Sequence, residues 1–233
     1  MKLDQLRQTY ADAGMELRLS TLYETDLGGV YGCQIPAGDE AVSLWEWLHS
    51  QALGSGYWPL LLGESDEWID TESISPQSWL EEAGKIDAVG LLSHETEPVP
   101  TSDSDQASTE PEEPGLLTPY DSDMLQLALL PCQKGWQAAA FVGFGGWNDT
   151  PEPPSQVAVQ KYWYERFGAE PVSMTDSELE MRVARPPKTE KEAMELARQH
   201  YSFCPDVVDQ GVGSLDILAR NLLHNPYWYF WWD

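Results

Sequence analysis

Three segments of the chain combine residue types that could bind a ligand or a metal ion. The first is the loop Phe-Gly-Gly-Trp-Asn-Asp at residues 144–149, where two glycines let the backbone turn freely and approach a ligand. Trp147 presents a flat ring, Asn148 an amide and Asp149 a carboxylate. The alternative is an ordinary strand-to-helix loop whose polar side chains satisfy local backbone groups. The loop lacks the Gly-x-Gly-x-x-Gly run and the lysine of a phosphate-binding loop.

The second segment is Cys-Pro-Asp-Val-Val-Asp-Gln-Gly at residues 204–211. Asp206 and Asp209 lie three residues apart, and Gln210 follows them. On one turn of the chain their oxygens could share a cation. The carboxylates could equally cap the helix expected after residue 213, or pair with basic residues of the same block, namely Arg182, Arg185 or Arg198.

The third segment is the aromatic run at residues 227–232, which leads to Asp233. Each buried aromatic side chain removes roughly 150–250 Å² from water, so we expect a buried strand rather than a solvated tail. If the sheet brings the segments together, Asp149, Asp206, Asp209 and Asp233 form a cluster of carboxylates. Such an oxygen-only set suits Mg²⁺, Mn²⁺ or Ca²⁺.

Nucleophilic and thiol chemistry have little support. The chain contains no Gly-x-Ser-x-Gly nucleophile elbow and no His-Glu-x-x-His zinc motif. His200 and Cys204 are four residues apart on one expected helix, where they are more often core residues than reacting groups. The three cysteines form no Cys-x-x-Cys pair, so we expect buried free thiols at Cys33, Cys132 and Cys204.

The charge is the strongest compositional signal, because the net charge is −26. Residues 1–92 hold 16 acidic residues against four basic ones, and residues 93–124 hold nine and none. Such a field repels nucleic acid and anionic membranes and favours a basic partner or cations, although simple solubility is the alternative. The N-terminal residues lack a signal-peptide pattern and no apolar run reaches membrane-spanning length, so we expect a cytoplasmic protein.

Residues 1–92 are expected to form an N-terminal α/β region. Residues 93–124 are rich in proline, serine and acidic residues, and we expect a disordered linker because they cannot bury enough apolar surface. Apolar periodicity and glycine breaks in the first block predict helices at 3–13, 39–52 and 75–84, and strands at 16–23, 30–35, 57–62 and 86–92.

Residues 125–233 are expected to form a C-terminal α+β domain. The same patterns predict helices at 155–167, 190–203 and 214–223, and strands at 125–130, 137–144, 171–174, 179–183 and 227–232. The first two strands read as a hairpin. This order predicts an α+β fold, with helices on one face of a mostly antiparallel or mixed sheet and with the C-terminal aromatic strand buried.

The C-terminal block, from Leu127 to Asp233, resembles a bacterial domain of unknown function, family 4253. The matching motifs are the Gly-Gly-Trp-Asn loop, an aromatic helix ending in Phe-Gly-Ala-Glu, Arg-Pro-Pro at 185–187, the Cys-Pro-Asp segment and the aromatic end. Thr150 stands where the family pattern has cysteine, and Phe167 where it has tyrosine. The resemblance implies membership of the family but no activity.

We therefore expect a non-enzymatic interaction module that neutralises or docks a basic protein partner. Small acidic proteins of toxin–immunity systems have this composition, which is an analogy only. The alternative is a divalent-metal-dependent hydrolase or a small-molecule binder that uses the carboxylate cluster, and a third option is a subunit with an aromatic oligomer interface. No cofactor is expected except, in the alternative, Mg²⁺, Mn²⁺ or Ca²⁺. The candidate binding residues are Trp147, Asn148, Asp149, Asp206, Asp209, Gln210 and Asp233, of which Asp206, Asp209 and Asp233 are the candidate metal ligands.

Overall fold

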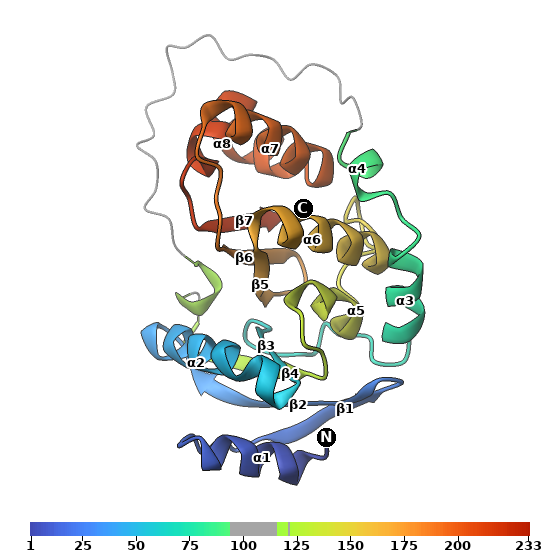
Figure 1. The fold of residues 1–233 in the computed structure, drawn as a ribbon, viewed down its shortest axis with the longest axis vertical. Coiled ribbons are helices and arrows are strands. Elements are labelled where there is room, and N and C mark those ends of the chain that lie inside the picture. Colours follow the sequence, from blue (N-terminus) through green and yellow to red (C-terminus); the bar gives the residue numbers. More distant parts are fainter. Residues whose placement is uncertain (94–115, 121) are drawn as a thin grey trace.

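A computed structural model describes residues 1–93, 116–120 and 122–233 (Figure 1). None of the helices in these residues is long and apolar enough to cross a membrane. The helices are α1 (Leu3–Asp12), α2 (Asp39–Ser55), α3 (Pro76–Ala83), α4 (Ala88–Leu91), α5 (Ala138–Val142), α6 (Pro153–Phe167), α7 (Glu190–Phe203) and α8 (Leu215–Leu222), with short 3₁₀ turns at Thr118–Tyr120 and Gly135–Gln137 and a π-helical turn at Val207–Val212. The strands are β1 (Ser20–Thr25), β2 (Gly28–Pro36), β3 (Trp58–Leu61), β4 (Met124–Leu130), β5 (Ala169–Met174), β6 (Glu178–Val183) and β7 (Tyr227–Trp231).

The strands form one mixed sheet in the order β1-β2-β4-β3-β5-β6-β7. Neighbouring strands are antiparallel except β3 and β5, which run parallel and meet at Leu61 and Ser173. Strand β4, at the start of the predicted C-terminal domain, lies between β2 and β3 of the N-terminal region. Both regions therefore contribute to a single sheet, which confirms the predicted mixed α+β class.

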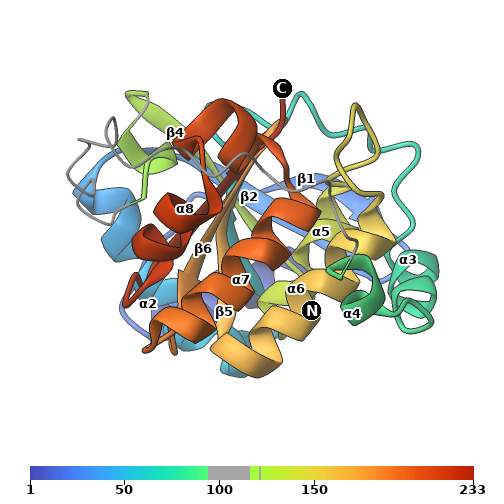
Figure 2. The ribbon, with the colours of Figure 1, turned by 90° about the horizontal axis from the view of Figure 1, so that it is seen from above.

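Helices cover both faces of this sheet, so the prediction of helices on one face is wrong. Helix α2 contacts one face, where His49 Nε2 lies 2.9 Å from Glu170 Oε2 on β5. Helices α6 and α7 lie side by side on the opposite face (Figure 2), where Trp163 packs on Trp228 and Phe230 of β7. Glu170 shares its face of the sheet with its cross-strand partners Arg182 and Tyr227, and Trp228, the next residue on β7, points to the other face.

The predicted burial of the aromatic C-terminal strand is confirmed. Trp228, Phe230 and Trp232 are at most 2% exposed and face the α6–α7 layer. Trp163 of α6 is fully buried at the centre of this cluster, with ring centroids 5.0–5.6 Å from those of Phe203, Trp228 and Phe230. The aromatic cluster thus ties α6 and α7 to the last strand of the sheet.

Two predicted strands are helices in the structure. The run at residues 137–144 forms the short helix α5, so the expected hairpin with β4 is absent. Three consecutive alanines, Ala138 to Ala140, favour a helix, and an apolar run buried on all sides has no periodicity that could separate the two structures. Residues 86–92 likewise contain the single helical turn α4.

The end of the predicted linker contacts the sheet. Leu117 N–H and Thr118 N–H donate hydrogen bonds to the two carboxylate oxygens of Glu180 on β6. Glu180 is 1% exposed, and its burial raises its pKa to about 6 although the two backbone donors oppose the shift. Residues 116–120 are therefore part of the fold. Most of the segment predicted to be disordered, residues 94–115 and 121, lies outside the described residues.

Candidate functional site

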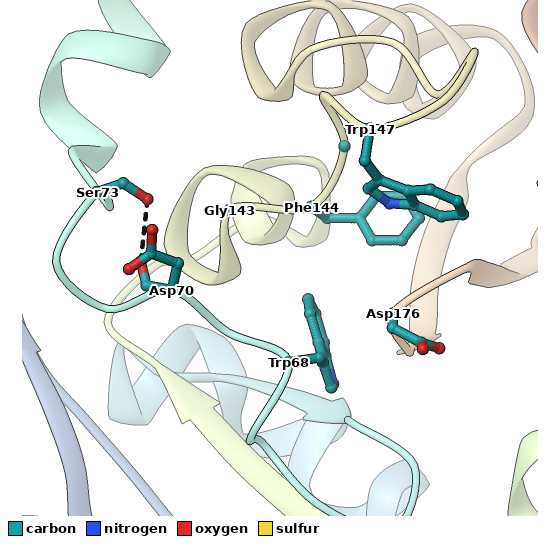
Figure 3. A pocket seen from close by; sticks show the side chains of 8 residues that line it. Trp68, Asp70, Ser73, Gly143, Phe144, Trp147 and Asp176 are labelled. Carbon is teal, nitrogen blue, oxygen red and sulfur yellow. Dashed lines mark hydrogen bonds between the residues drawn. The ribbon is translucent and has the colours of Figure 1, made fainter.

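A cavity of about 360 Å³ opens where the two parallel strands end. Trp68, Asp70 and Ser73 line it from the loop after β3, and Asp176 lines it from the turn after β5. The third wall is the loop between α5 and α6, which contributes Gly143, Phe144, Gly145 and Trp147. Figure 3 shows the rings of Trp68, Phe144 and Trp147 grouped together, with Asp176 beside Trp68.

Trp147 is positioned by the backbone of its loop, which requires a glycine at residue 145. Gly145 has φ +112°, and a Cβ atom there would lie 2.1 Å from the carbonyl oxygen of Pro151. The loop closes on itself through hydrogen bonds from Gly146 N–H to Thr150 O and from Thr150 N–H to Trp147 O, at 3.2 and 3.0 Å. The loop therefore holds the Trp147 ring at the cavity through its backbone.

The loop after β3 is held in a similar way. Trp68 Nε1 donates a hydrogen bond of 3.3 Å to Leu62 O, directly beyond the end of β3. Asp70 Oδ1 accepts from the Glu72 N–H at 3.2 Å, and Asp70 O accepts from Ser73 Oγ at 3.1 Å. One oxygen of the Asp70 carboxylate thus organises the loop.

The cavity is acidic. Its charged lining residues, Asp70 and Asp176, are both exposed and form no ion pair with a lysine, arginine or histidine of the described chain. The loop at residues 64–72 carries five carboxylates and no basic residue. A cation in the cavity would therefore meet carboxylates that are not already neutralised.

The first predicted site lies partly in this cavity. Trp147 lines it, whereas Asn148 and Asp149 are exposed residues of the same loop and are not among the lining residues. Asn148 adopts φ +45°, a left-handed conformation that asparagine tolerates better than most residues and that turns the loop.

The structure brings three residues of the other predicted sites together, as a structural anchor. Asp206 Oδ2 accepts from the Asp233 N–H at 3.2 Å, and Asp206 Oδ1 accepts from Gln210 Nε2 at 2.9 Å. Asp209 instead accepts from the Tyr201 hydroxyl at 3.2 Å. The hydrogen bonds of Asp206 fasten the end of β7 to the π-helical turn.

The four carboxylates of the alternative metal site do not form a cluster. Nowhere in the described parts of the chain are three histidine, cysteine, aspartate or glutamate side chains placed to hold a metal ion. The physical reason is that Asp206 bonds to the backbone of Asp233 and Asp209 turns to Tyr201, so the carboxylates do not converge.

The buried histidine and cysteine behave as core residues. His200 is 1% exposed, and burial lowers its pKa to about 3, so the ring is neutral at physiological pH. Burial raises the pKa of Cys204 to about 12, and its Sγ lies 3.0 Å from Trp231 O. All three cysteines are free, as expected; Cys132 and Cys204 are buried, but Cys33 is only half-buried, so its expected burial is wrong.

Comparison with protein families gives a match over the second half of the chain. Residues 126–233 match the family described as domain of unknown function DUF4253. These residues form a DUF4253 domain. No curated protein and no solved structure matches the chain.

The DUF4253 residues do not form a separate sheet. Strand β3, which lies outside the matched residues, is inserted between β4 and β5. Three of the five motifs of the resemblance lie close together around one ring. Trp232 of the aromatic end packs on Phe144, at the start of the glycine loop, and on Phe203, which directly precedes the Cys-Pro-Asp segment. The ring centroids lie 5.7 and 5.5 Å apart.

Of the eight lining residues, Trp147 alone was a predicted site residue. Gly143, Phe144 and Gly145 adjoin it in the same loop, whereas four lie in other segments: Trp68, Asp70, Ser73 and Asp176. Three of them lie before the DUF4253 domain, in the acidic loop 64–73. A tryptophan within a run of five carboxylates that directly follows a buried strand is the signal that could have identified this loop. Asp176, in the Thr-Asp-Ser turn between β5 and β6, has no comparable signal.

Proposed function

We propose that the protein is a non-enzymatic interaction module that docks a basic protein partner, in the manner of an immunity protein that neutralises a basic toxin. The observation that carries this proposal is the cavity between Trp68 and Trp147, which has acidic and aromatic lining residues and no basic one. Uncompensated carboxylates beside aromatic faces suit a positively charged ligand. The same field disfavours nucleic acid and anionic membranes as partners.

The acidic loop 64–72 supports a protein partner rather than an isolated cation. Its carboxylates extend the negative surface beyond the cavity, so several basic side chains could be engaged at once. Long-range attraction of this kind raises association rates and is screened by salt, because the Debye length is about 10 Å at 0.1 M.

The test is the salt dependence of binding to a basic probe. We would measure the fluorescence anisotropy of a labelled peptide of alternating arginine and glycine, with the full chain, at 50 and 300 mM NaCl. The triple variant Glu64→Gln/Glu67→Gln/Glu72→Gln removes three charges beside the cavity, and Asp12→Asn/Glu16→Gln/Glu165→Gln removes three elsewhere.

We expect the dissociation constant to rise steeply with salt and to rise much more in the loop variant than in the control. Equal effects of the two triple variants would show that only net charge matters and would contradict docking at the cavity. Binding that is insensitive to salt would contradict the proposal as a whole.

A small-molecule binder is the second candidate, because the cavity alone is large enough for a ligand. Metal-dependent hydrolysis lacks a comparable observation. A thermal shift of the full chain in Mg²⁺, Mn²⁺ and Ca²⁺ tests it, since an ion that binds the folded state raises the melting temperature.

A further inference from the structure

We propose that the cavity receives a guanidinium group, the arginine side chain of the basic partner, between the rings of Trp68 and Trp147 and beside Asp176. This inference rests on the proposed function and names the chemical group that the site selects. Its basis is the juxtaposition, around one opening, of three aromatic rings and two carboxylates that form no ion pair within the described residues (Figure 3).

The aromatic lining favours a flat, weakly hydrated cation. A guanidinium is planar, stacks on aromatic faces and loses less hydration than an ammonium when it is covered. Tryptophan provides the strongest cation–π contact of the aromatic side chains, and two of the three rings are tryptophans. A lysine ammonium is compact and strongly hydrated, so its contact with the aromatic rings would be less favourable.

The carboxylates of the cavity can accept hydrogen bonds from the N–H groups of a guanidinium. Asp176 Oδ1 accepts from Ser177 Oγ at 3.2 Å, and no hydrogen bond to its Oδ2 is found within the described residues. In Figure 3 Asp70 lies apart from the three rings, on the opposite side of the opening from Asp176, and adds negative charge from the loop after β3. A guanidinium has five N–H donors and no acceptor, so it can bond to a carboxylate while its face remains on a ring.

The position in the fold is one that proteins use for binding. Strands β3 and β5 are the parallel neighbours among the described strands, and the cavity lies beyond their carboxyl ends. Crevices outside the carboxyl ends of parallel strands are the common ligand sites of open α/β sheets. The backbone of the Gly145 loop and the hydrogen bond from Trp68 to Leu62 O hold two walls before any ligand arrives.

The surroundings favour an arginine within a polypeptide over the free amino acid. Free arginine carries both an α-carboxylate and an α-ammonium, so its backbone end brings no net positive charge to the carboxylates of loop 64–72. In a basic peptide the residues beside the arginine carry further positive charges, which can meet the acidic loop.

The experiment is an NMR titration of the full chain labelled with ¹⁵N at its 11 tryptophan indoles. Trp68→Phe and Trp147→Phe assign the two signals of interest. The ligands are N-acetyl-arginine methylamide, its uncharged citrulline analogue, its lysine analogue and free arginine.

We expect the arginine amide to shift the Trp68 and Trp147 signals saturably, with a dissociation constant at least tenfold lower than that of the citrulline analogue. Free arginine, which has the same net charge, should bind no more tightly than the amide. The lysine amide should bind more weakly than the arginine amide. Trp147→Ala and Asp176→Asn should each weaken binding about tenfold, which corresponds to 1.4 kcal/mol. Trp136→Ala, which removes an indole outside the cavity, and Glu165→Gln should leave binding within twofold.

Other results would overturn the inference. Equal binding of the citrulline analogue would show that charge does not matter, and tighter binding of free arginine than of the arginine amide would indicate a small-molecule ligand. Should the basic peptide still bind with steep salt dependence while the arginine amide leaves both indoles unshifted, the guanidinium pocket would be wrong and the proposed function would stand. Thermal melts of each variant identify any loss of binding that is due to unfolding.

Discussion

The buried carboxyl of Glu180 gives a prediction with a defined sign and pH window. Its pKa is raised from 4.5 to about 6 by burial, so the folded protein holds this proton more tightly than the unfolded chain does. The stabilisation is therefore fully present below pH 4.5 and is lost as the pH rises through 6. The difference between these two pKa values corresponds to about 2 kcal/mol in total.

Between pH 5 and pH 7.5 the wild type should lose about 1 kcal/mol of its free energy of unfolding through this group, because titration is already under way at pH 5. Glu180→Gln removes the titration and keeps one oxygen acceptor for the Leu117 and Thr118 amides. We expect the difference in unfolding free energy, wild type minus Glu180→Gln, to be about 1 kcal/mol larger at pH 5 than at pH 7.5.

Urea unfolding of both proteins at the two pH values measures this difference, provided that the m-value is unchanged. Glu165→Gln, on the exposed side of α6, corrects for the loss of one charge from a chain of net charge −26. If the difference in unfolding free energy between the wild type and Glu180→Gln does not depend on pH, the raised pKa of Glu180 is refuted. A difference larger at pH 7.5 would mean that the two backbone donors outweigh burial.

Three further predictions concern packing and backbone geometry, each measured by urea unfolding. Trp163→Ala should lower the unfolding free energy by about 3–5 kcal/mol, since the ring is fully buried among four aromatic side chains. A loss below about 1 kcal/mol would contradict this packing. Gly145→Ala should lower the unfolding free energy by about 1–3 kcal/mol, because residue 145 has a positive φ and its Cβ would meet the Pro151 carbonyl oxygen. The control Gly54→Ala, in open space on α2, should not destabilise the protein, and equal effects of the two variants would argue against a strained loop. Asp206→Ala should cost about 1–2 kcal/mol and speed amide exchange at Asp233, and unchanged exchange would remove its anchoring role.

Sequence patterns predicted the elements whose signals are local. The spacing of Thr189 and Glu192 predicts a helix cap, and in the structure the Glu192 N–H donates to Thr189 Oγ1 at 3.2 Å at the start of α7. The burial of the aromatic C-terminal strand followed from area alone. The prediction of a strand at residues 137–144 was wrong, because an apolar stretch that is buried on all sides has no exposed face to distinguish a strand from a helix.

The candidate site was harder to predict because its walls come from three distant parts of the chain. Trp147 was found from its loop, but Trp68 and Asp176 meet it only through the parallel pairing of β3 with β5, which no local pattern encodes. Asp206 and Asp233 do meet in the structure, but the contact uses the backbone N–H of Asp233, so it anchors the strand. Burial and hydrogen-bond partners, which decide such roles, are properties of the folded chain.

The most direct test of docking at the cavity is to map where a basic peptide lies on the protein. An arginine-rich peptide with a benzophenone group beside one arginine, irradiated with the full chain at low salt, should cross-link to residues 64–73, 143–149 and 175–177. The yield should fall in Asp70→Asn/Asp176→Asn and persist in Glu16→Gln/Glu165→Gln. Cross-links that concentrate on another acidic surface, such as α1 or the start of α7, would contradict the account.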